Sequence, residues 1–215
     1  MSRKGVLYAL LTLCSASWTI TAIAPHDLEA WALEQIATLL CLGLVVWTAR
    51  HVTYSLGCWV GLAVLFILHT IGTHFTYSLT PYDEFLNSLV GVSINDSMGW
   101  ERNHYDRIVH FVFGLTTARV FFEYLHAKLT TSHPMAWFLA LHLVLSTSAI
   151  YELMEWAAAA VFAAEAGAMY LGTQGDIWDA QVDILLAGIG ACLSIALSCF
   201  PRNSLRDPVG DVGQA

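Results

Sequence analysis

Aspartate, glutamate and histidine side chains recur inside the long apolar stretches of this chain, where an ionisable group is costly to bury. Asp106 and His110 are four residues apart, so they share one helix face, and the carboxylate can orient the imidazole or share a metal ion with it. Asp179 and Asp183 repeat this spacing, and Glu152 lies in another apolar stretch. We predict that these five residues carry the chemistry of the protein.

Several carboxylates in one dry cavity need a compensating cation or protons. A divalent metal is one solution, because imidazole and carboxylate groups are common metal ligands. The candidate ligands are His69, His74, His104, Asp106, His110, Glu152, Glu155, Asp179 and Asp183. The acids could instead share protons in an acid–base pair or relay, or they could form a structural network with Arg102, Arg107 and protonated histidines. The sequence leaves these three solutions open.

The elements that position these residues are membrane-spanning helices. Of the 215 residues, 57% are hydrophobic and 12% are charged, about half the charged share of a typical soluble domain. A spanning helix needs about 20 mainly apolar residues. Six stretches meet this need, and they predict an all-α membrane bundle: Gly5–Ala24, Ala30–Ala49, Leu56–Phe75, Tyr105–Leu125, Pro134–Met154 and Ile177–Phe200.

The two ends of the chain need separate interpretation. Basic residues before the first apolar stretch, followed by Ala22-Ile23-Ala24, resemble a cleaved signal peptide. The stretch is longer than the usual signal core, so we expect a retained helix. Residues 1–201 are predicted to form a single transmembrane domain, and residues 202–215 are predicted to form a flexible cytoplasmic tail.

The distribution of lysine and arginine predicts the orientation, because cytoplasmic loops carry an excess of both. With a cytoplasmic N-terminus, only Arg102 and Arg107 lie outside. The inner side then carries Arg3, Lys4, Arg50, Arg119, Lys128, Arg202 and Arg206. We therefore expect both termini in the cytoplasm.

This orientation brings the ionisable residues of four helices to one level, the outer leaflet. Glu34 has no acid or histidine partner in its own helix, so we interpret it as peripheral. Pro81 followed by Asp83 and Glu84 is typical of a helix start and predicts a short amphipathic helix at the outer interface. A second interfacial element is expected at 156–166, and Asp176 is a candidate N-cap for the last helix.

Four ordered motifs resemble the bacterial inner-membrane family typified by YjdF: LHTIGTHFTY at 68–77, WERNHYDRIVHF at 100–111, YELMEW at 151–156 and GTQGDIWDAQVD at 172–183. The resemblance covers about Leu56 to Leu197 and implies an inner-membrane location, but that family has no established activity. A weaker likeness extends to the VanZ-like proteins associated with glycopeptide resistance. They show an Asp-Lys-x-x-His-Phe helix start, which 106–111 matches with Arg107 in place of lysine.

Three functions fit these observations. The first is an envelope enzyme, metal-dependent or acid–base, that acts on a lipid or lipid-linked substrate. The second is a small transporter or ion-coupled carrier, although the inner half of the bundle offers few polar groups. The third is a non-enzymatic structural or binding module. The lipid bilayer is the expected partner, and the net charge of −8 argues against nucleic acid. No residue pattern assigns an oligomeric state.

Overall fold

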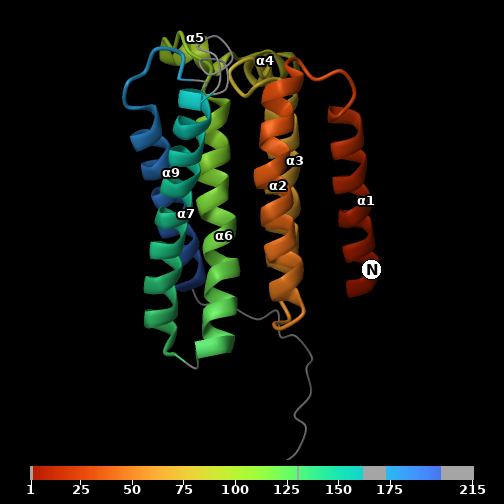
Figure 1. Ribbon diagram of the computed structural model, residues 1–215, viewed down its shortest axis with the longest axis vertical. Helices are drawn as coiled ribbons and strands as arrows, with labels where there is room; N and C mark the ends of the chain where they lie inside the picture. Colours follow the sequence, from red (N-terminus) through yellow and green to blue (C-terminus); the bar gives the residue numbers. More distant parts are fainter. Residues whose placement is uncertain (1, 130, 162–172, 200–215) are drawn as a thin grey trace, which may run out of the picture.

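The computed structural model describes residues 2–129, 131–161 and 173–199, and all regular elements in this part of the chain are helices (Figure 1). Six are long: α1 (Arg3–Thr21), α2 (Leu28–Ala49), α3 (Leu56–His74), α6 (Tyr105–Leu129), α7 (His133–Val161) and α9 (Asp179–Cys199). Two are short, α4 (Tyr82–Val90) and α5 (Ile94–Met98). The long helices alternate in direction, and α4 and α5 lie across one end of the bundle, which we call the α4 end.

Five of the long helices are long and apolar enough to cross a membrane: α2, α3, α6, α7 and α9. Helix α1 has 19 residues but does not belong to this group. Arg3 and Lys4 at its start, together with its serines and threonines, lower its hydropathy. Thr12, Thr19 and Thr21 turn their hydroxyls back onto its own carbonyls. The structure thus supports a multi-pass helical protein, while the sixth span stays a prediction.

Local chemistry explains where the helices begin. Ser2, Asp27 and Ser55 cap α1, α2 and α3 by accepting a hydrogen bond from the backbone N–H three residues ahead. Helix α4 follows Pro81 and carries two acids in its first turn, so the predicted short helix is present. The sequence did not predict α5, which Asp83 stabilises by accepting hydrogen bonds from Ser93 and from the N–H of Ile94.

Two boundaries correct the sequence predictions. Helix α7 continues without a break to Val161, so residues 156–161 extend it and do not begin a second interfacial element; 162–166 lie outside the described residues. Helix α9 begins at Asp179, three residues after the expected N-cap. The carboxylate of Asp176 instead accepts a hydrogen bond from the N–H of Trp178, 2.9 Å away, and this closes a turn ahead of the helix.

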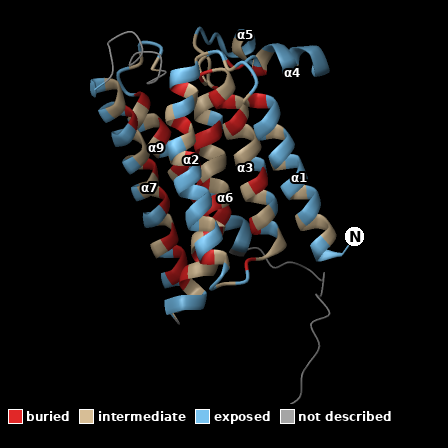
Figure 2. Ribbon diagram, turned by 45° about the vertical axis from the view of Figure 1, so that its right-hand side comes forward, coloured by how far each residue is buried: buried red, intermediate tan, exposed pale blue. Residues whose placement is uncertain are grey.

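Helices α6, α7 and α9 pack into the main core, with α3 against α6 and α1 against α3. The core cluster consists of Ala118, Phe122, Leu125, Ala136, Trp137, Ala140, Val144, Ala187 and Ala191. Two glycines permit the close crossing of α6 and α9. A Cβ at Gly114 would lie 1.8 Å from the carbonyl oxygen of Ala187, and one at Gly190 would lie 2.1 Å from that of Phe111. The outward faces are exposed and apolar, as a bilayer requires (Figure 2).

Candidate functional site

The five residues that we predicted to carry the chemistry lie together at the α4 end of the core. Asp106 and His110 come from the first two turns of α6, Glu152 comes from the far half of α7, and Asp183 comes from the second turn of α9. Asp179 lies one turn before Asp183. Because α6 and α9 both start at the α4 end and α7 runs toward it, the up-and-down topology brings the separate motifs together.

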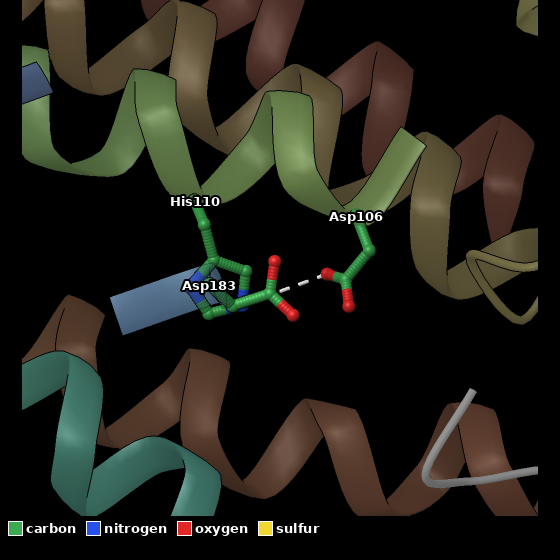
Figure 3. A group of neighbouring side chains, drawn as sticks. All are labelled: Asp106, His110 and Asp183. Atoms are coloured by element: carbon green, nitrogen blue, oxygen red, sulfur yellow. Dashed lines mark ion pairs between the residues drawn. The ribbon is translucent and has the colours of Figure 1, made fainter. Parts of the chain in front are cut away.

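His110 lies at the centre of this site and is only 6% exposed. Its Nε2 is 3.2 Å from Glu152 Oε1 and 3.6 Å from Asp106 Oδ1. Its Nδ1 faces the hydroxyl of Ser148 at 3.5 Å. Figure 3 shows the side chains of Asp106, His110 and Asp183 pointing toward one another from α6 and α9. One ring nitrogen therefore faces the carboxylates, and the other faces a hydroxyl on α7.

Three buried carboxylate oxygens at the site lack a hydrogen-bond donor: Glu152 Oε1, Asp179 Oδ1 and Asp183 Oδ1. Glu152 Oε1 is 3.2 Å from His110 Nε2, and Asp179 Oδ1 is 2.7 Å from the charged Arg102 Nη1. Neither contact has the geometry of a hydrogen bond. Buried oxygens without donors are uncommon in folded proteins, and each one calls for an explanation.

Two arginines form the rim of the site. Arg102 Nη1 is 3.2 Å from Asp176 Oδ2, and Arg107 Nη2 is 2.5 Å from the same oxygen. Asp179 Oδ1 lies between them, 3.5 Å from Arg107 Nη2. The hydrogen bond from the Trp178 N–H, together with Arg107, lowers the pKa of Asp176 below its ordinary value. The predicted arginine network thus forms with Asp176 and Asp179.

The remaining candidate histidines have other partners. His69 lies between the hydroxyls of Thr38 and Tyr77, 2.6 and 2.5 Å from its two nitrogens. His74 bonds to the carbonyl of Thr21 through Nδ1. His104 Nδ1 accepts a hydrogen bond from Arg107, and burial followed by the arginine charges lowers the pKa of His104. The structure therefore separates these histidines from the group around His110.

Sequence reasoning missed three contributors to the site. The prediction that Glu34 is peripheral is wrong: it is 4% exposed and accepts a hydrogen bond from the hydroxyl of Tyr151 at 2.8 Å. The hydroxyl of Ser148 faces His110, and the ring centroid of Tyr151 is 6.0 Å from that of the His110 imidazole. One signal could have revealed Glu34, because it is the only acid in its apolar stretch. Glu155, one of the candidate ligands, is also buried, at 8% exposure.

The opposite end of the bundle has a different character. Arg119 Nε donates to Glu123 Oε1 at 2.8 Å, and Glu123 Oε2 accepts from the N–H of Ser55. The ion pair lies within α6, and the hydrogen bond from Ser55 ties α6 to the start of α3. Apolar residues of the core cluster, among them Ala118, Val144 and Ala187, lie between it and the acidic site.

Comparison with known proteins places the chain in a family. Residues 6–203 match the model of a family described as "Predicted membrane protein (DUF2238)". The chain is 32% identical over 188 residues to the inner membrane protein YjdF of Escherichia coli (strain K12), covering 86% of each chain. No solved structure matches it. The chain therefore belongs to this family of multi-pass inner-membrane proteins, as the four motifs indicated.

Proposed function

We propose that this protein is an enzyme that activates water or a hydroxyl group for attack on a lipid or lipid-linked substrate at the outer leaflet. The observation that carries the proposal is Glu152 Oε1, which is buried, has no hydrogen-bond donor and lies 3.2 Å from His110 Nε2. A buried carboxylate oxygen with a free lone pair can accept a proton from a hydroxyl group or water bound next to it.

The roles follow from the contacts. Asp106 and His110 hold the attacking O–H, and Glu152 takes its proton as the oxygen attacks. Glu152 then returns this proton to the leaving oxygen of the substrate as the scissile bond breaks. Arg102 and Arg107 hold Asp179 at the rim, so that α9 keeps Asp183 facing α6. General base catalysis of this kind typically contributes about 10²–10⁴-fold to a rate.

The position of the site supports a lipid substrate. It lies in the first turns of spanning helices, beside α4, whose Phe85, Leu89 and Val90 are exposed. An amphipathic helix with an exposed apolar face is suited to lie in a bilayer interface, where lipid headgroups meet the protein. The apolar cluster beneath the site disfavours a transport path.

The orientation is part of the proposal. Arg102 and Arg107 lie at the α4 end, whereas Arg3, Lys4 and Lys128 lie toward the other end. The excess of basic residues belongs on the cytoplasmic side. We therefore infer that α1 is a sixth span, that both termini are cytoplasmic and that the α4 end faces outward. Residues 1–201 then form one transmembrane domain, followed by a cytoplasmic tail at 202–215.

Lipid turnover tests the proposal. The protein is reconstituted in nanodiscs made from a total lipid extract of bacterial inner membrane, and the lipids are followed by mass spectrometry. We expect the wild type to consume one lipid species and Asp106→Asn to slow this at least about 100-fold. Asp96→Asn is the matched control, because Asp96 is exposed on α5. Unchanged lipids with the wild type, or equal turnover by Asp106→Asn, would refute the proposal.

A further inference from the structure

The side chains of Asp106, His110 and Asp183 form a group with the geometry of an ion site. Each offers one ligand atom, and these atoms all lie within 4.8 Å of one another (Figure 3). Ligands of one metal ion bound at about 2.0–2.2 Å lie roughly 3–4 Å apart. Small side-chain rotations would therefore close the group around an ion, without movement of α6 or α9.

Asp183 supplies an independent indication of a ligand. Its side chain is 1% exposed and points at Asp106, yet its Oδ1 has no hydrogen-bond donor. A carboxylate taken out of water needs hydrogen bonds, a counter-charge or a metal ion. Neither arginine of the rim forms an ion pair with Asp183 or Asp106, because both are engaged by Asp176 and Asp179. Among the described residues, Asp183 therefore forms no ion pair, and its Oδ1 has no hydrogen-bond donor.

The imidazole of His110 has the orientation of a metal ligand. Its Nε2 faces Asp106 and Glu152, and its Nδ1 faces the hydroxyl of Ser148. Metal-binding histidines commonly donate their second ring N–H to a neighbouring oxygen, which fixes the tautomer and the ring plane. With Nδ1–H directed at Ser148, the lone pair of Nε2 is left free for an ion.

We propose that Asp106, His110 and Asp183 bind one divalent first-row transition-metal ion, with Glu152 beside it. One imidazole and two carboxylates suit Mn²⁺ or Zn²⁺ better than Ca²⁺, which prefers an all-oxygen shell. The ion brings two positive charges to the otherwise unpartnered carboxylates. This inference rests on the proposed function for one point, the role of the ion. In the proposed reaction the ion would hold the water whose proton passes to Glu152.

The experiment measures Mn²⁺ binding to the full-length protein in nanodiscs after removal of metals with a chelator. Electron paramagnetic resonance reports free Mn²⁺, so a titration gives the stoichiometry and affinity. We expect one ion per wild-type chain, an affinity more than about tenfold weaker in Asp183→Asn, and nitrogen couplings to the bound ion that disappear in His110→Gln. Asp96→Asn, at an exposed position on α5, is the control and should bind like the wild type.

The outcomes separate this proposal from the proposed function. No stoichiometric Mn²⁺ in the wild type, or equal binding by wild type and Asp183→Asn, rejects the ion site even if lipid turnover is found. Bound metal with nitrogen coupling from His110 supports the ion site even if no lipid is consumed. The unfolding temperature of each variant shows whether it is folded, and Ser148→Ala, which leaves all three ligands in place, provides a second variant with weakened binding.

Discussion

Asp83 is the residue whose role is local and can be isolated most easily. Its carboxylate accepts hydrogen bonds from Ser93 Oγ at 2.6 Å and from the N–H groups of Ile94 and Asn95 at 2.7 and 3.2 Å. These bonds lower the pKa of Asp83, with Ser93 making the largest contribution. The carboxylate thus stabilises the start of α5 only while it is ionised.

This gives a pH prediction with a definite sign. The folded protein holds the pKa of Asp83 below its ordinary value of 3.8, so the stabilisation is present above that pH and is lost as the pH falls through the lowered pKa. Cleavage of 91–99 by pepsin should therefore increase in the wild type below pH 3.8. Asp83→Asn should be cleaved faster than the wild type at pH 5 and change less on acidification.

Glu84→Gln is the control for this measurement, because it removes the same charge from the same helix. The Glu84 side chain does not contact Ser93 or Asn95. It should follow the wild type. Equal cleavage of Asp83→Asn and wild type at pH 5 would show that Asp83 does not stabilise α5.

At the residue scale, the sequence predicts which side chains share a face of one helix, but it does not predict which side chains contact each other between helices. The i, i+4 spacing of Asp106 and His110 sets their common face before any packing is known. Glu34 was misjudged because its partner, Tyr151, lies on α7, and no spacing within α2 reveals a contact across the bundle. The pairing of Asp176 with Arg102 and Arg107 likewise depends on how the loop before α9 meets the start of α6 and the loop before it.

At the scale of elements, the close crossing of α6 and α9 sets the geometry of the site. Gly114→Ala would place a methyl group 1.8 Å from a backbone oxygen of α9, so the two helices must separate. Overpacking of a core usually costs about 1–3 kcal/mol, and a clash with backbone lies at the upper end. We expect a lower unfolding temperature in detergent or nanodiscs, and weaker function as Asp183 moves away from Asp106.

Gly43→Ala is the matched control, because Gly43 lies mid-helix on α2 with nothing within 4 Å of the added Cβ. Alanine is favoured over glycine in a helix interior by about 0.5–1 kcal/mol, so this variant should be neutral or slightly more stable. If Gly114→Ala were as stable as Gly43→Ala, the described crossing of α6 and α9 would be wrong.

The elements themselves were largely predictable, because a run of about 20 apolar residues has few structural alternatives. All six expected stretches are helices, with ends that agree to within a few residues except at α7, which runs seven residues beyond Met154 to Val161. Apolar composition marks where a helix can cross the bilayer but does not mark where it ends at the interface. Helix α5 has five residues, too few for a periodic pattern, and forms because Asp83 and Ser93 cap it.

At the scale of the whole molecule, the charge distribution predicts the orientation. A fluorescent protein fused after Ala215 should fluoresce, because it stays in the cytoplasm, whereas alkaline phosphatase at the same position should be inactive. Phosphatase inserted after Gly91, between α4 and α5, should be active. Active phosphatase at the C-terminus would invert the proposed topology and move the site to the cytoplasmic leaflet.

The central claim is that the buried acids serve function at some cost to stability. Glu152 Oε1 is buried beside His110 without a hydrogen-bond donor, and an ionised carboxylate left in this state costs stability that a structural role would not require. A protein of this size shifts its unfolding temperature by about 2–4 °C for each kcal/mol of change in its free energy of unfolding.

The most direct test compares Glu152→Gln with the wild type in two measurements, the unfolding temperature and the lipid turnover, both made in the same nanodiscs. We predict an unfolding temperature equal to or above that of the wild type, with turnover lost. A variant that unfolds several degrees lower and loses turnover only in proportion to the folded fraction would show that the acids are structural, which contradicts the account.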